Sequence, residues 1–207
     1  MDRSRLPEFG LMLAAAYGVL LAAAYLAGNA CLDALIPVYR WEIGWLSVDW
    51  RITDFRLAQS HGEQVYSLGL EQVNYLFAGS RLLPPGGSVS SSTLAGHTLQ
   101  QAVIFLGLVF AWPASGLASR IARSVAGVPL LLLAVMLDVP LVLIGSVDDL
   151  IHANLAPGSS TFFMAWMNFM NGGGRHAIAV AAALCCVALY PGKPLSLASD
   201  QIKCRAG

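Results

Sequence analysis

Uncharged apolar runs long enough to cross a lipid bilayer dominate the pattern of apolar and polar positions in this chain. Residues 99–118 contain no charge, and residues 125–146 contain only one, Asp138. A helix rises about 1.5 Å per residue, so each run matches a hydrocarbon core of roughly 30 Å. Arg120 and Arg123 lie in the short segment between the runs, and short basic loops face the cytoplasm. The pattern predicts a helical hairpin with a cytoplasmic turn.

Two further apolar runs, residues 10–28 and 176–190, bring the predicted number of membrane spans to four. The basic residues flanking these runs are Arg3, Arg5, Lys193, Lys203 and Arg205. Because basic flanks stay inside, both termini are predicted to be cytoplasmic. A cleaved signal peptide is the alternative for the first run, since small residues before Cys31 loosely mimic a cleavage site. We expect the run to be retained as an anchor.

The insertion between the first two spans, residues 40–97, contains a predicted β hairpin. Apolar and polar residues alternate over residues 49–59 and 63–72, with a turn at Ser60–Gly62. The apolar face of this hairpin comprises Thr53, Phe55, Leu57, Tyr66, Leu68 and Leu70. Two strands alone are marginal in water. The hairpin should therefore lean on the membrane, on residues 73–83 or on another protein.

Two shorter segments complete the predicted elements. Residues 88–93 form a polar lead into the second span, with Ser92 or Thr93 available as its N-cap. Residues 161–170 are apolar nearly all round but too short to cross a bilayer, and end at a glycine triplet, residues 172–174. They predict a separate interfacial or re-entrant helix.

Asp138 is the main anomaly within the predicted spans. A carboxylate at a helix centre costs about 2.5 to 3.5 kcal/mol on insertion scales, so it should face protein or water and have a partner. One interpretation is a proton or ion pathway. The other, which we favour, is a buried hydrogen-bonded residue that orders helix packing or holds a partner subunit.

Cys31, His97, Arg175 and His176 are each predicted near the outer end of a helix. A thiol beside an imidazole and a guanidinium is the combination that a cysteine nucleophile needs. Their convergence would make the chain a peptidase or transpeptidase. The alternative is that arginine and histidine lie at the membrane boundary and the cysteine fills space. We favour this alternative.

Methionines and a histidine suggest a second alternative site, for a metal. Thioether and imidazole ligands suit Cu(I). The candidate ligands are His152, Met164, Met167 and Met170. Aromatic side chains surround these methionines, however, and a methionine and aromatic stripe more often packs. We predict no cofactor.

Composition supports a membrane protein and excludes one class of partner. The chain is 57% hydrophobic and 12% charged, with zero formal net charge, and its mean hydropathy is +0.64. These values are too apolar for an ordinary soluble domain. No basic patch with interleaved aromatics is present, so nucleic-acid binding is not expected.

Several short strings resemble small membrane proteins associated with bacterial exosortase systems. These are STLAGHTLQ at residues 92–100, FAWP at residues 110–113 and GGGR before the last span, together with the anchor and the hairpin. An exosortase is a membrane cysteine transpeptidase that processes sorting signals, and its associated proteins have no established catalysis. This chain is shorter than the enzyme, with fewer spans and an early Cys31. The resemblance implies an accessory role.

Together these patterns predict a single all-α integral membrane domain, residues 1–207, in the bacterial inner membrane. It would have about four transmembrane helices, a small extracytoplasmic β hairpin and one short interfacial helix. The expected function is that of a non-catalytic accessory or subunit of an export, sorting or envelope-assembly complex. The residues expected to contact the partner membrane protein are Phe55, Leu57, Tyr66, Leu68 and Trp166.

Overall fold

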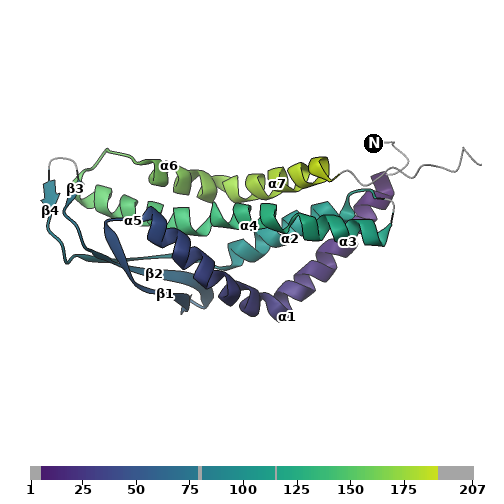
Figure 1. Ribbon diagram of the computed structural model, residues 1–207, viewed down its shortest axis with the longest axis horizontal. Coiled ribbons are helices and arrows are strands. Elements are labelled where there is room, and N and C mark those ends of the chain that lie inside the picture. Colours follow the sequence, from purple (N-terminus) through teal and green to yellow (C-terminus); the bar gives the residue numbers. More distant parts are fainter. Residues whose placement is uncertain (1–5, 79–80, 115, 191–207) are drawn as a thin grey trace, which may run out of the picture.

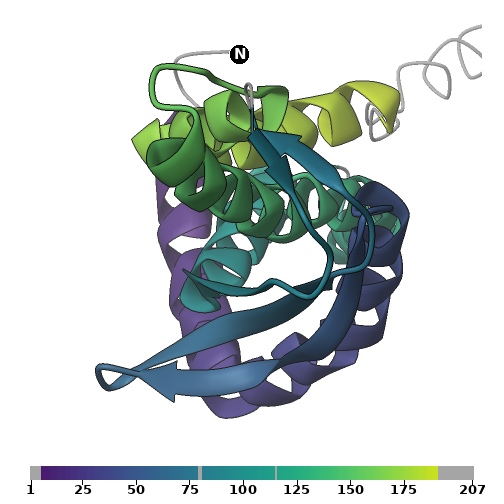
Figure 2. The ribbon, with the colours of Figure 1, turned by 90° about the vertical axis from the view of Figure 1, so that its left-hand side faces the viewer.

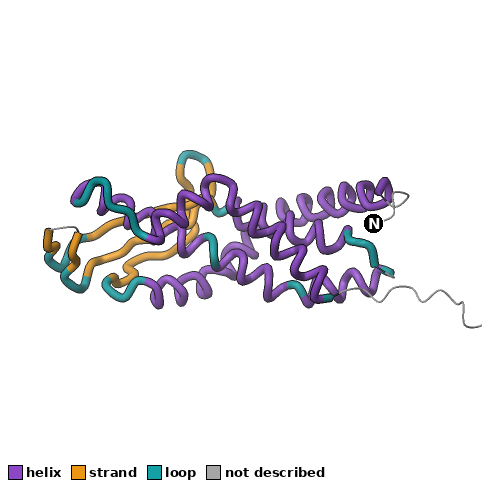
Figure 3. The backbone as a smooth tube through the Cα atoms, turned by 90° about the horizontal axis from the view of Figure 1, so that it is seen from above, coloured by secondary structure: helices purple, strands orange, loops and turns teal. Residues whose placement is uncertain are grey.

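The computed structural model describes residues 6–78, 81–114 and 116–190. Its elements, in chain order, are α1 (Leu6–Leu46), β1 (Trp50–Ser60), β2 (Glu63–Gln72), β3 (Leu76–Ala78), β4 (Arg81–Leu83), β5 (Ser88–Leu94), α2 (Gly96–Ala111), α3 (Leu117–Ala126), α4 (Val128–Met136), α5 (Val139–Leu155), α6 (Phe162–Phe169), a π-helical turn (Met170–Gly174) and α7 (Arg175–Leu189). The strands occupy one end of an elongated molecule (Figures 1 and 3). The start of α1 and the end of α7 lie at the opposite end (Figure 1).

Three helical stretches are long and apolar enough to span a membrane: Pro7–Leu46, Leu117–Leu155 and Phe162–Leu189. They suggest a membrane protein. The predicted span at residues 99–118 is wrong in its bounds, because α2 ends at Ala111. Trp112 precedes a proline and adopts φ −59° and ψ 135°, the extended conformation that a following proline favours. At 16 residues, α2 is shorter than the three candidate spans.

Helix α1 is much longer than the predicted first span. It has 41 residues and continues through Pro37, whereas the predicted first span ends at residue 28. Leu32, Tyr39 and Ile43 are fully buried, and their spacing of seven and four residues places them on one helix face. That face packs against the sheet. In the most apolar 18-residue stretch of this helix, by contrast, only 6% of the residues are buried.

The predicted basic turn after α2 is also wrong, since Arg120 and Arg123 lie within helix α3. Helices α3, α4 and α5 follow one another almost without a gap, with interruptions at Gly127 and Asp138. The single predicted span at residues 125–146 is therefore a broken helix. The prediction that both termini are cytoplasmic depends on basic residues that lie outside the described residues, namely Arg3, Arg5 and those in residues 191–207.

The structure confirms the β1–β2 hairpin and its turn. Ser60 pairs with Glu63, and His61 and Gly62 both have positive φ, as a two-residue type I′ turn requires. Register slips between Ile52 and Asp54. Thr53 is consequently exposed, and Ile52 packs against the core in its place.

A third strand, β5, was not predicted. Residues 88–94 pair antiparallel with β2, so Ser92 and Thr93 are sheet residues and do not cap a helix. The N-cap position of α2 is Ala95, which makes no side-chain cap. The sheet order is β1-β2-β5, and β3 and β4 form a separate pair. In Figure 2, α5 and α6 (green) lie above the β1–β2 hairpin, and the later half of α1 (dark blue) lies at the right.

The sheet is fixed to the helices by one continuous core. Buried side chains from α1, β1, β2, α4 and α5 form a single cluster. Tyr66 packs edge-on against Tyr39 with ring centroids 5.3 Å apart, and stacks on Phe55 at 5.9 Å. The Tyr66 hydroxyl donates to the Leu32 carbonyl at 3.0 Å, and burial raises the pKa of Tyr66, which keeps it a neutral donor.

This core corrects the predicted partner surface. Phe55, Tyr66 and Leu68 are 5%, 0% and 0% exposed, and Leu57 is half-buried against the same cluster. They face the chain's own helices, so they do not present an apolar face to another protein. The hairpin leans on α1 and α5, and not on residues 73–83.

A short helix is present where it was predicted: α6 ends at Phe169, just before the glycine triplet, and a kinked π-helical turn joins it to α7. Its interfacial position stays a prediction. The glycine triplet marks a kink: Gly173 has φ 110°, which favours glycine. Helix α6 packs along α5 at Gly145, where an added Cβ would meet the Phe163 carbonyl oxygen. This close approach fixes the two helices side by side.

Candidate functional site

Asp138 lies at the break between α4 and α5, with φ −98° and ψ −82°. Pro140, which follows, has no N–H to continue the helical hydrogen bonds. At the same break, the Leu137 carbonyl accepts from the Trp166 indole Nε1, at 2.7 Å. The Asp138 side chain is buried.

The partner of Asp138 is Arg175, the first residue of α7. Arg175 Nε donates to Asp138 Oδ1 at 2.8 Å, and the two side chains are 8% and 1% exposed. Gln101 of α2 donates to Asp138 Oδ2 at 3.0 Å. Arg175 Nη2 lies 3.4 Å from Thr93 Oγ1 on β5. Three separate parts of the sequence thus meet at one buried ion pair: β5 with α2, the start of α5, and the start of α7.

This arrangement suits a structural lock better than an ion pathway. Both Asp138 oxygens accept hydrogen bonds, and the carboxylate is almost fully enclosed. A buried pair with both partners satisfied resists any change that would leave one charge alone. The pair and its hydrogen bonds link β5 and α2 to α5 and α7. The pair therefore holds the sheet in a fixed position relative to the helices.

The residues of the cysteine alternative are only partly brought together. His97 is the second residue of α2, and this helix packs against α7, which begins with Arg175 and His176. Cys31 is a free, exposed thiol on α1. The Arg175 guanidinium pairs with Asp138, so it is not the cation that would activate the Cys31 thiol.

The residues of the metal alternative take part in packing. Met167 and Met170 are buried against Val142, and the Ser146 hydroxyl donates to Met167 Sδ at 3.2 Å. His152 Nδ1 lies 2.8 Å from the Asp148 carbonyl of its own helix, and Met164 is half-buried. In the described ranges, no group of three or more His, Cys, Asp or Glu side chains is placed to hold a metal ion.

No known protein family, curated protein or solved structure matches this chain. Its function must be read from its own geometry.

The sequence did not predict that Thr93 and Gln101 hydrogen-bond to the Asp138–Arg175 pair. Gln101 is 1% exposed, and an amide within an otherwise apolar helix is a signal that it has a polar partner. The sequence around Thr93 did not indicate a buried partner, because a threonine in a serine-rich segment is equally typical of a helix cap or a loop.

The second functional feature is the open edge of the sheet. Strand β1 is 11 residues long, about 36 Å at the usual strand rise. Within the described part of the chain, β2 is the only strand that pairs with it. Arg51 pairs with Glu71, and Arg56 with Asp54 at 3.0 Å. These exposed charges protect an edge from indiscriminate pairing while leaving its backbone groups available.

Proposed function

We propose that this protein is a non-catalytic membrane accessory subunit that holds an extended segment of a partner protein along the edge of strand β1. The carrying observation is that only β2 pairs with β1 among the described strands, while the sheet is fixed to the helices by a shared core and a buried ion pair. Strand addition to such an edge gains backbone hydrogen bonds without reorganising the receiving sheet. A partner in export, sorting or envelope assembly, such as an exosortase system, fits this role.

The proposal includes a membrane orientation. Arg120 and Arg123 of α3 lie at the end of the molecule opposite the sheet (Figure 1), and basic residues at membrane boundaries favour the cytoplasm. The sheet would then be periplasmic, in a bacterial inner membrane, with both termini cytoplasmic and α2 as a fourth, short crossing.

Cysteine labelling tests this orientation. In a background with the native cysteines replaced, Gln59→Cys should react with a membrane-impermeant maleimide in intact spheroplasts, whereas Ala118→Cys should react only after permeabilisation. Both positions are exposed. The reverse labelling pattern would contradict the orientation without affecting the strand-addition argument.

A proline substitution tests docking on β1. The two-residue turn makes Ser60 and Glu63 the hydrogen-bonded closing pair. Backbone groups of Gln59, one residue earlier, therefore point to the open edge. Gln59→Pro removes an outward N–H but no bond within the sheet. Gln59→Ala is the matched control, because it removes the side chain and keeps the N–H.

The readout is a photo-crosslinking amino acid at the exposed position of Arg56, in cells that carry the native partners. We expect a discrete adduct that survives Gln59→Ala and disappears with Gln59→Pro, while the hairpin stays folded by circular dichroism. An adduct that persists in the proline variant refutes strand addition.

Cys31→Ala separates the accessory role from a cysteine enzyme. An exposed thiol replaced by a methyl group loses little packing, so processing by the partner should be unchanged. If the variant inserts, keeps its crosslink and yet abolishes processing, the chain is an enzyme, and the accessory function is wrong.

A further inference from the structure

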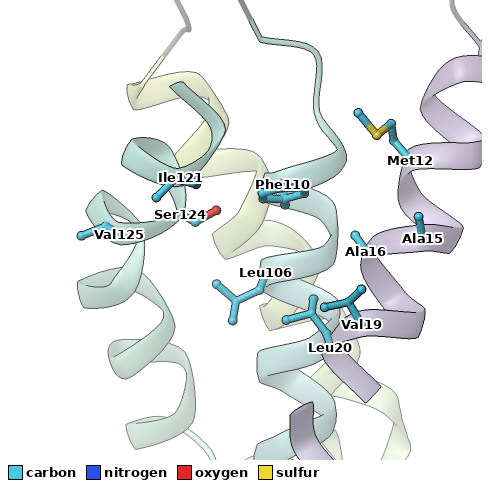
Figure 4. Close-up of a pocket in the computed structure, with 10 residues that line it drawn as sticks. All are labelled: Met12, Ala15, Ala16, Val19, Leu20, Leu106, Phe110, Ile121, Ser124 and Val125. Carbon is cyan, nitrogen blue, oxygen red and sulfur yellow. The ribbon is translucent and has the colours of Figure 1, made fainter. Parts of the chain in front are cut away.

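An apolar groove lies between the N-terminal half of α1 and the helices α2 and α3. Its volume is about 420 Å³, within the range of small-ligand sites. The side chains on its walls include Ala15, Val19, Leu106, Phe110, Ile121 and Val125. Figure 4 shows the α1 and α3 side chains on either side of α2. In a membrane, such a groove accepts an alkyl chain.

A second cavity, of about 340 Å³, adjoins the groove and shares Met12 with it. It lies toward the start of α1 and differs in character, because a carboxylate and a guanidinium, Glu8 and Arg120, both line it. Glu8 is one helical turn from Met12. The two cavities together form an apolar slot with a charged end, which matches the shape of an amphiphile.

The two charged side chains of this second cavity are not paired with each other in the described residues. Arg120 Nη1 donates to the Phe110 carbonyl at 2.8 Å and lies 3.4 Å from the Ala111 carbonyl, which fixes the guanidinium beside the end of α2. Among the described residues, its Nε and Nη2 have no hydrogen-bond partner. No ion pair involves Arg120 or Glu8 within the described residues. A phosphate diester would accept from Arg120, and a primary ammonium would donate to Glu8.

We propose that this groove binds one glycerophospholipid with a phosphoethanolamine headgroup: an acyl chain lies between α1 and α3, the phosphate at Arg120 and the ammonium at Glu8. An anionic headgroup without the amine would meet Arg120 but be repelled by Glu8. The chemistry therefore favours a zwitterionic aminophospholipid over an anionic one. The proposal requires these helices to lie in a membrane, but it is independent of docking on β1.

Native mass spectrometry of the purified full chain tests whether the groove binds a phosphoethanolamine lipid. The delipidated protein is offered equal amounts of phosphatidylethanolamine and phosphatidylglycerol with identical acyl chains. We expect one retained phosphatidylethanolamine. Ala15→Trp, which fills the groove, should lose it. Ala23→Trp, an exposed α1 position outside the groove, should keep it. If Ala15→Trp fails to fold, Val19→Trp fills the same groove from an exposed position.

Charge variants separate the two headgroup contacts. Arg120→Gln should weaken binding of both lipids about tenfold, as expected for loss of one hydrogen bond to a charged group. Glu8→Gln should lower the preference for phosphatidylethanolamine about twofold to fivefold, because the carboxylate is exposed and surface pairs are weak.

Two results would overturn the proposal. Equal retention of both lipids, unchanged by the tryptophan variants, would mean that the lipid is only part of the general annulus. A dimer lost on groove filling would mean that a second copy of the chain occupies the groove. The β1 crosslink should be unaffected by the groove variants, so failure here and failure of the proposed function are distinguishable.

Discussion

Removing one partner of the Asp138–Arg175 pair should destabilise the protein more than removing both. Asp138→Leu leaves a buried guanidinium without its carboxylate, and Arg175→Met leaves the reverse. Each should cost about 3 to 5 kcal/mol. The double variant, Asp138→Leu with Arg175→Met, leaves no unpaired charge and should cost less than either single change.

The magnitude follows from the geometry of the pair. At the observed 2.8 Å separation, the Coulomb attraction is about 6 kcal/mol for an effective dielectric constant near 20. Desolvation of both ions offsets much of that attraction when the pair is intact. When one ion is deleted, the other keeps its desolvation cost and loses the compensation, so the single variants suffer most.

Asp138→Asn tests the hydrogen bonds separately from the charge. The asparagine oxygen can still accept from Arg175, and the new NH₂ group can donate to Gln101 Oε1, which is buried without a partner in the described residues. That bond requires only a rotation of the Gln101 amide. We therefore expect Asp138→Asn to be less destabilised than Asp138→Leu.

The assay is unfolding of the detergent-solubilised protein, followed by thermal melting and by titration with a denaturing detergent. A loss of 3 to 5 kcal/mol corresponds to a fall in Tm of roughly 10 °C for a chain of this size. The single variants should show this fall. If the double variant costs the sum of the two single changes to within about 0.5 kcal/mol, the residues are not coupled and the lock interpretation is refuted.

Two further predictions concern packing and use the same unfolding assay. Gly145→Ala should cost about 1 to 3 kcal/mol, because the new methyl meets the Phe163 carbonyl and must part α5 from α6; Gly18→Ala, with open space around it, should be neutral or slightly stabilising, and equal effects would contradict this packing. Tyr66→Phe removes the hydrogen bond to the α1 backbone but keeps the ring stack, so we expect a loss of about 1 kcal/mol. The matched change at Tyr25, which is 90% exposed, should have no measurable effect, and a Tyr66→Phe variant as stable as the wild type would exclude a contribution from this bond.

The sequence by itself determined the features that depend on local periodicity. The last apolar run corresponds closely to α7, and the alternation of apolar and polar residues around the turn at Ser60–Gly62 located β1 and β2. Asp138 had to have a buried partner, because an isolated carboxylate is costly in an apolar helix. Each of these conclusions needs only the residues within one segment.

Tertiary structure decided what depends on contacts between segments. Helix α1 extends to Leu46 because Leu32, Tyr39 and Ile43 pack against a sheet whose strands lie later in the chain. The serine-rich residues 88–94 become β5 because β2 offers a pairing edge, although their own composition resembles a loop. Strand propensity depends on such context far more than helix propensity does.

The ion pair shows the same division most clearly. The sequence predicted that Asp138 has a partner, but it did not identify Arg175, which was interpreted as a membrane-boundary residue. The kink after α6 places Arg175 beside Asp138 at the start of α5. The lipid groove has no local signature at all, since its walls come from three helices whose apolar residues look alike in sequence. Local sequence fixes which groups need burial or pairing, but chain topology selects the partner, because the partners meet only after the helices pack.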